Sequence, residues 1–99
     1  MDETYYFESS LELYEYMSDN KYEVNQYIYD KIRNYLLLDI ELETIPLFYY
    51  ENDGIVLKIE IGVNPINLIK PLQHCLDRFT EIEEYEKCSE CLNLIKSIS

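Results

Sequence analysis

An Asp-Gly pair, Asp53-Gly54, separates two runs of β-forming residues, 45–51 and 55–62. Asp-Gly between such runs is the strongest short-range signal for a β-hairpin, because both residues tolerate the positive φ angles of a two-residue turn. The turn also decides which residues lie opposite one another. The expected pairs are Asn52 with Ile55, Tyr50 with Leu57, and Phe48 with Ile59. The fold of this chain must therefore accommodate an antiparallel hairpin near its centre.

Alternation along the two runs divides the side chains of the hairpin between two faces. Lys58 and Glu60 are expected on the solvent face, beside Tyr49 and Leu47 respectively. The other face is apolar and is expected to cover the core: Phe48, Tyr50, Ile55, Leu57, Ile59 and Ile61. An isolated hairpin is marginally stable, so this apolar face needs helices packed against it.

Two helices are predicted before the hairpin. Residues 1–8 form an extended arm or an edge strand, and a capping box of Ser9 and Glu12 then opens a helix that Asp19-Asn20 ends. Asn20 caps a second helix over 21–37. The apolar stripes are Leu11, Tyr14 and Met17 in the first helix, and Val24, Ile28, Ile32, Tyr35 and Leu36 in the second. Residues 38–43 then alternate apolar and acidic side chains, which predicts a third strand.

Two further helices are predicted after the hairpin. Because proline disrupts a helix interior, Pro71 predicts a short turn near 65–69 and a helix over 71–79. Thr80 and Glu83 fit a capping box for a last helix over 81–97. The order is α-α-β-β-β-α-α, an α+β fold with helices packed on a small antiparallel sheet. The 99 residues are expected to form one domain, residues 1–99.

Three cysteines and one histidine raise the possibility of a zinc site. Cys88 and Cys91 lie three residues apart, and His74 and Cys75 precede them. Zinc needs four ligands in a tetrahedron, and paired ligands usually come from turns, whereas these pairs fall on predicted helices. Cysteine is also among the most buried residue types. The sequence therefore predicts core thiols, with no metal and no cofactor, and melting that a chelator does not change.

Catalysis finds little support in the sequence. A single histidine leaves little room for serine or cysteine nucleophile sites. Two glycines exclude a glycine-rich phosphate loop. The many carboxylates offer no one pair whose environments would separate two pKa values. We expect a binding protein and not an enzyme.

Net charge limits the choice of partner. Twenty acidic residues against eight basic ones leave a formal charge of −12, and the N-terminal part is the most acidic. Such a surface repels nucleic acid and anionic membranes and attracts proteins with basic grooves. The low glycine and proline content and the abundant apolar residues argue against an acidic disordered chain. The N-terminus carries no basic, apolar signal segment, so a cytoplasmic location is expected.

Carboxylates and tyrosines coincide in the first part of the chain. Tyrosine beside a carboxylate suits an arginine of a partner, through cation–π contact and hydrogen bonds. The partner-binding residues expected there are Glu12, Glu15, Tyr16, Asp19, Tyr22 and Glu23. A second group, Asp39, Glu41 and Glu43, would lie about 6.5 Å apart along the predicted third strand, close to the spacing of phosphates on a nucleic-acid strand. Glu83, Glu84 and Glu86 give a further acidic row.

These features favour a small inhibitory protein that mimics the charge of nucleic acid and blocks the basic groove of a nucleic-acid-binding enzyme. Short, acidic chains without motifs resemble phage counter-defence proteins, including anti-CRISPR and anti-restriction inhibitors, although the similarity is one of composition. The alternative is an immunity protein or antitoxin that neutralises a basic nuclease toxin. A monomer or small homodimer is expected in both cases, without direct nucleic-acid or membrane binding.

Overall fold

The Asp-Gly turn forms the hairpin that it predicts, between β2 (Thr44–Asn52) and β3 (Ile55–Gly62). In this computed structural model, which describes residues 5–38 and 43–98, Asp53 and Gly54 have φ angles of 51° and 78°. Positive φ at both positions is the signature of a type I′ turn. The predicted register is confirmed: Asn52 pairs with Ile55, Tyr50 with Leu57, and Phe48 with Ile59.

A register shift between Pro46 and Phe48 changes the base of the hairpin. Proline cannot donate to a ladder hydrogen bond and is found at such irregularities. Leu47 is the extra residue, so Glu60 lies opposite Pro46 and not beside Leu47 as expected. The shift turns Leu47 and Phe48 both inward, where they are only 4% and 1% exposed.

The sheet is mixed, because a third strand, β1 (Tyr5–Phe7), runs parallel to β2 on the side away from β3. The N-terminal segment is thus an edge strand, one of the two forms expected for it. The third strand predicted over 38–43 cannot be compared with the structure over its whole length. Leu38 ends a helix, and residues 39–42 lie outside the described residues.

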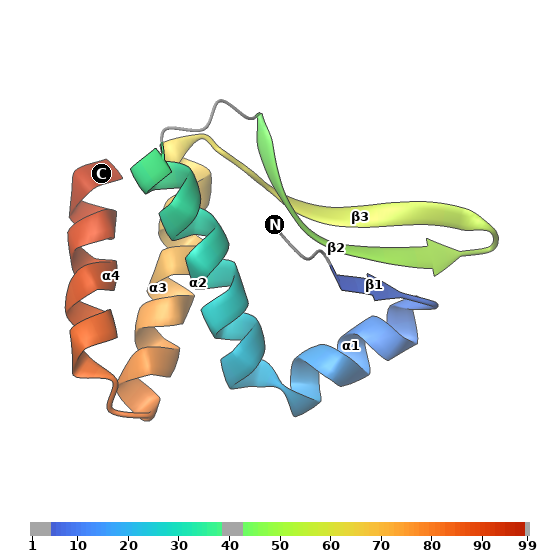
Figure 1. Ribbon diagram of the computed structural model, residues 1–99, viewed down its shortest axis with the longest axis horizontal. Helices are drawn as coiled ribbons and strands as arrows, with labels where there is room; N and C mark the ends of the chain where they lie inside the picture. The colour runs from blue at the N-terminus through green and yellow to red at the C-terminus, as the bar shows by residue number, and fades with distance from the viewer. Residues whose placement is uncertain (1–4, 39–42, 99) are drawn as a thin grey trace.

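The α+β class is confirmed, with two helices before the hairpin and two after it (Figure 1). The helices are α1 (Ser10–Asp19), α2 (Lys21–Leu38), α3 (Pro65–Glu81) and α4 (Tyr85–Ile98). Figure 1 shows α2, α3 and α4 side by side, with the hairpin projecting away from them and α1 lying beneath it. The buried side chains between the helices include Ile32, Leu68, Leu72, Cys75, Phe79 and Cys91.

Aromatic side chains fill the space between the sheet and the first two helices. The ring of Phe48 lies 5.5 Å from Tyr27, 6.1 Å from Phe7 and 6.2 Å from Tyr5, measured between centroids. Tyr16 of α1 contacts Tyr5 and Phe7 at 5.4 Å and 5.3 Å. These tilted ring pairs all have the centroid spacing of about 4.5–7 Å that aromatic rings prefer. This aromatic cluster holds α1 and β1 against β2.

The expected break at Pro71 is wrong, because α3 is continuous through it. Leu68, Leu72, Cys75 and Phe79 are all buried on one stripe that spans the proline. Their packing offsets the hydrogen bond that proline removes, which costs about 3 kcal/mol in an exposed helix. Thr80 likewise does not cap a new helix: its hydroxyl donates to the Leu76 carbonyl inside α3.

The predicted Ser9 cap of α1 is confirmed, with the Glu12 carboxylate bound one residue earlier than in a capping box, and the predicted apolar stripe is wrong at Leu11 and Tyr14. The Glu12 N–H donates to Ser9 Oγ at 3.1 Å, and the Glu12 carboxylate accepts from the Glu8 N–H at 3.0 Å. Leu13 is the buried residue of this helix, while Leu11 and Tyr14 are 65% and 67% exposed. The Tyr16 side of α1 faces inward, because the Tyr16 ring packs against Tyr5 and Phe7 in the aromatic cluster.

We predict that Gly54→Val destabilises the protein by about 1–3 kcal/mol, because a β-branched residue is a steric outlier at positive φ. No atom of the described residues lies within 4 Å of a Cβ at this position, so the backbone angle causes the loss. Gly54→Asn is the matched control, since asparagine tolerates this region. Thermal melts measure the stability of both variants. Equal melting temperatures for the valine variant and wild type would contradict the positive φ of Gly54 in this turn.

Candidate functional site

The junction between α1 and α2 places three expected site residues on one surface. The N–H and the side-chain amide of Asn20 both donate to the Tyr16 carbonyl, at 2.9 Å and 3.0 Å. The Asn20 carbonyl also accepts from the Val24 N–H at 2.9 Å, so Asn20 stands at the start of α2 as predicted, but its side chain closes α1. Because α2 starts at once with Lys21, the exposed side chains of Asp19, Tyr22 and Glu23 gather around a sharp corner.

A hollow of about 180 Å³ lies at this corner and is lined by residues 18–23. A water molecule occupies about 30 Å³ in the liquid, so the hollow admits a group of several heavy atoms such as a guanidinium. The ammonium of Lys21 lies 5.0 Å from the centroid of the Tyr22 ring. The Tyr22 ring thus already lies beside a cation, and Asp19 and Glu23 line the same hollow.

The turn between α3 and α4 brings a second group of carboxylates to the same end of the molecule. The Tyr22 hydroxyl donates to Glu81 across 3.3 Å, which joins the two groups. Figure 1 shows the α1–α2 corner and the α3–α4 turn along one edge. We call this surface the acidic end; its carboxylates, all exposed, are Asp19, Glu23, Glu81, Glu83, Glu84 and Glu86.

The basic residues near the acidic end have internal contacts. Arg78 forms an ion pair with Glu81 at 2.8 Å. Lys87 donates to Gln26 at 2.8 Å and lies over the Phe79 ring. Asp19, Glu23, Glu83, Glu84 and Glu86 form no ion pair within the part of the chain that the structure describes. Their negative charge is therefore left for solvent or for a partner.

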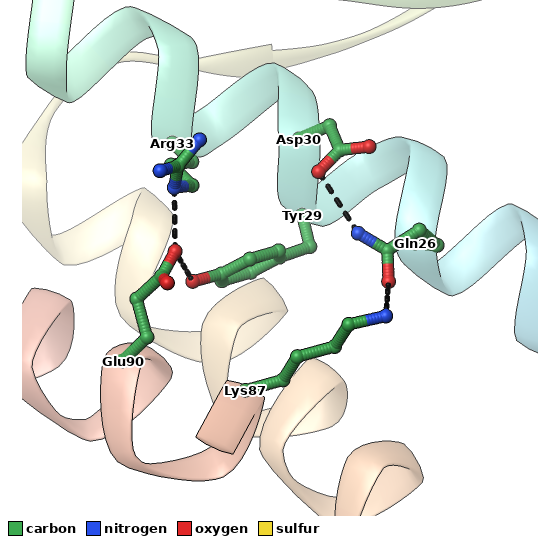
Figure 2. Close-up of polar contacts among 6 residues, drawn as sticks. All are labelled: Gln26, Tyr29, Asp30, Arg33, Lys87 and Glu90. Atoms are coloured by element: carbon green, nitrogen blue, oxygen red, sulfur yellow. Dashed lines mark hydrogen bonds and ion pairs between the residues drawn. The ribbon is translucent and has the colours of Figure 1, made fainter. Parts of the chain in front are cut away.

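A polar network behind the acidic end fixes α4 against α2 (Figure 2). Tyr29 donates to Glu90, which also pairs with Arg33, and Gln26 donates to Asp30 while accepting from Lys87. The Tyr29 hydrogen bond and the Arg33 charge hold the pKa of Glu90 below its usual range. Tyr29 is 2% exposed, and its ring lies edge-on to that of Phe79. The network keeps the α1–α2 corner and the α3–α4 turn in a fixed relation.

The other expected site residues have different positions. Glu15 is exposed one helical turn before Asp19, on the same side of α1. Glu12 accepts the cap hydrogen bond, and Tyr16 belongs to the aromatic cluster, so neither is available as a free contact. Glu43 is exposed just before β2, away from the acidic end (Figure 1). Asp39 and Glu41 lie outside the described residues.

Sequence reasoning missed an exposed aromatic residue next to Glu15. Tyr14 was assigned to the apolar stripe of α1 and is instead on its outer face, with Leu11. The spacing of Leu13, Tyr16 and Met17 also fits a helical face, and it is this face that packs inward. The two alternative stripes could not be ranked without knowing where the aromatic cluster lies.

The three cysteines are buried free thiols, as the sequence predicts. Burial raises the pKa of Cys75 to about 12 and that of Cys91 to about 11. The Cys91 thiol donates to the Leu72 carbonyl at 3.0 Å, so it acts as a polar contact between α3 and α4. Over residues 5–38 and 43–98, no group of three or more histidine, cysteine, aspartate or glutamate side chains is placed to hold a metal ion.

We predict that a strong chelator leaves the melting temperature unchanged, because buried thiols in helices pack without a metal. Differential scanning calorimetry with and without chelator measures the effect, after dialysis of both samples. Metal bound to folded protein contributes directly to stability, so a large drop on chelation would contradict the prediction. In that case the metal would be sought at Cys75, Cys88 and Cys91.

No described helix is both long and apolar enough to cross a membrane. Comparison with known proteins finds no family model that matches the chain, no similar curated protein and no similar solved structure.

Proposed function

We propose that this protein is a small acidic inhibitor that mimics nucleic acid and occupies the basic nucleic-acid-binding groove of a target protein. The setting that fits best is phage counter-defence of the anti-CRISPR or anti-restriction type, in the cytoplasm of the host cell. A CRISPR effector offers such a groove, because it holds its nucleic-acid duplex in a positively charged channel. The protein itself performs no reaction in this proposal.

The acidic end is the observation that supports the proposal. Its carboxylates come from two turns that are far apart in sequence and are joined by the Tyr22–Glu81 hydrogen bond. Among the described residues most of them find no ion-pair partner, whereas Glu60 and Glu90 do. Uncompensated like charge destabilises a fold, so its concentration at one rigid end favours a binding role over simple solubility.

The expected mechanism is competition for the groove. Long-range attraction between the acidic end and a basic groove accelerates encounter, as electrostatic complementarity does in other complexes. At the hollow, a partner arginine displaces Lys21 from the Tyr22 ring and contacts Asp19 and Glu23. Arginine and lysine side chains held in this way are no longer available to phosphates, so nucleic acid is excluded.

Capture from a bacterial lysate tests the proposal when the immobilised wild-type protein is compared with an Asp19→Lys, Glu23→Lys variant. Mass spectrometry should identify a nucleic-acid-binding protein that wild type retains and the variant does not. Added duplex DNA or RNA should elute it, because the two ligands share one groove. Capture that nucleic acid does not compete, or that the variant retains, would contradict the proposal. A captured nuclease toxin would favour the immunity-protein alternative.

A further inference from the structure

The outer edge of β3 is open and apolar. The strand order is β1-β2-β3, so within the described residues no strand pairs with this edge. Its first residues, Ile55, Val56 and Leu57, are 62%, 56% and 38% exposed although their side chains are aliphatic. A long, exposed and apolar edge strand is a template for pairing with another strand.

The backbone of β3 alternates between groups that face β2 and groups that face outward. Ile55 flanks the two-residue turn and pairs with Asn52, and the Val63 N–H donates to the Glu43 carbonyl, so the odd-numbered residues face β2. The N–H and C=O groups of Val56, Lys58, Glu60 and Gly62 are therefore directed to the open edge. A partner strand must use these four residues.

We propose that two copies of this chain pair through β3 in antiparallel orientation, with Ile59 on the two-fold axis. The two sheets then continue into one sheet of twice the strand number. In this register Lys58 lies opposite Glu60 of the second copy, and Glu60 lies opposite its Lys58. Val56 and Gly62 form the outer pairs, so each outward-facing residue meets an outward-facing residue.

The charges on β3 select this register over its neighbours. A shift that places the axis at Lys58 sets the two lysines opposite each other, and a shift to Glu60 sets the two glutamates opposite each other. Like charges in directly opposed positions destabilise a sheet, and opposite charges stabilise it. Lys58 and Glu60 already share one face, since they form an ion pair at 3.3 Å. In the dimer the Lys58–Glu60 ion pairs of the two copies lie opposite each other, so that lysines and glutamates alternate around a ring of four side chains.

The apolar residues of β3 also gain contacts in this register. Leu57 lies opposite Ile61 of the second copy, and Ile55 lies opposite its Val63. A hollow of about 420 Å³ opens beside the end of β3, between Gly62 and the α3 residues Asn67 and His74. The turn of the second copy extends past Gly62 toward this hollow, which leaves space for it.

The dimer and the acidic end use different parts of the molecule. In Figure 1 the hairpin projects from the helices, and the α1–α2 and α3–α4 turns lie along the opposite edge. Each copy therefore keeps its acidic end exposed. The proposal does not rest on the inhibitory function, and either can fail while the other stands.

A charge-exchange experiment tests the dimer. Sedimentation velocity over a wide range of protein concentration, at physiological salt, should show a monomer–dimer equilibrium for wild type. Lys58→Glu and Glu60→Lys should each raise the dimer dissociation constant by about tenfold or more, because both opposed pairs become repulsive. A mixture of the two variants should form a heterodimer, since every opposed pair is then complementary. Lys96→Glu on α4 makes the same charge change away from β3 and should dimerise as wild type does.

Circular dichroism melts of each variant monitor the fold, because Glu60 also accepts a hydrogen bond from Thr44. Two results would overturn the proposal. One is a wild-type protein that stays monomeric at all concentrations. The other is a dimer that Lys58→Glu does not weaken, or variants that show no preference for each other on mixing.

Discussion

Phe48→Ala should lower the free energy of unfolding by about 3–5 kcal/mol, the typical cost of removing a buried phenylalanine ring. Phe48 is 1% exposed, and three other rings contact it from β1 and α2. Removing it leaves a cavity bordered by rigid rings that cannot collapse into the space. Because small domains are stable by about 5–15 kcal/mol in total, the variant should be partly unfolded at physiological temperature.

Tyr14→Ala is the control for Phe48→Ala. It deletes a ring of similar size from a site that is 67% exposed, and should change stability by less than about 0.5 kcal/mol. Urea titration of both variants with the same probe gives the comparison. Equal midpoints would show that the aromatic cluster does not hold the sheet to α1 and α2.

The hairpin was predictable because its signal is local. Asp53 and Gly54 set the turn, and the turn sets every pair up to Phe48. The register shift at Leu47 was not predicted, although Pro46 is a visible reason for one. The alternation of residues 45–61 was interpreted as unbroken, and the shift carried Leu47 to the core face together with Phe48.

The errors in the helices come from tertiary packing that outweighs local preference. Pro71 is unfavourable inside a helix, but Leu68, Leu72 and Cys75 bury a stripe that continues past it. In α1 two apolar faces were possible, and the aromatic cluster selected the face with Leu13 and Tyr16. Neither outcome follows from a helical wheel, because each depends on what lies opposite the helix.

Of the two parts of the candidate site, sequence reasoning could predict only the one at the α1–α2 corner. Asp19, Tyr22 and Glu23 lie close in the chain, so their proximity follows from the end of one helix and the start of the next. Their contact with the α3–α4 turn does not follow from the sequence. It depends on the packing of α2 against α3 and on the Tyr22–Glu81 contact, which joins residues 59 positions apart.

The Asp19→Lys, Glu23→Lys variant should lose target binding, with an association rate at least about tenfold below that of wild type at low salt. Each replacement of a carboxylate by lysine raises the net charge by two units, so the net charge of the variant rises from −12 to −8. Glu8→Lys, Glu43→Lys gives the same net charge through exposed residues away from the acidic end, and should bind nearly as wild type does. Glu12 is left unchanged in both, because its carboxylate accepts the cap hydrogen bond of α1.

Two further variants at the same surface separate effects on the association rate from effects on the dissociation rate. Tyr22→Ala removes the ring that a partner arginine would stack on, so the dissociation rate should rise more than the association rate falls. Lys21→Gln removes the internal cation that lies over this ring, and should strengthen binding. Surface plasmon resonance against the captured target, repeated at several salt concentrations, resolves both rates. Weaker binding by Lys21→Gln, or unchanged binding by Asp19→Lys, Glu23→Lys, would mean that the partner contacts some other surface and that the acidic end serves only solubility.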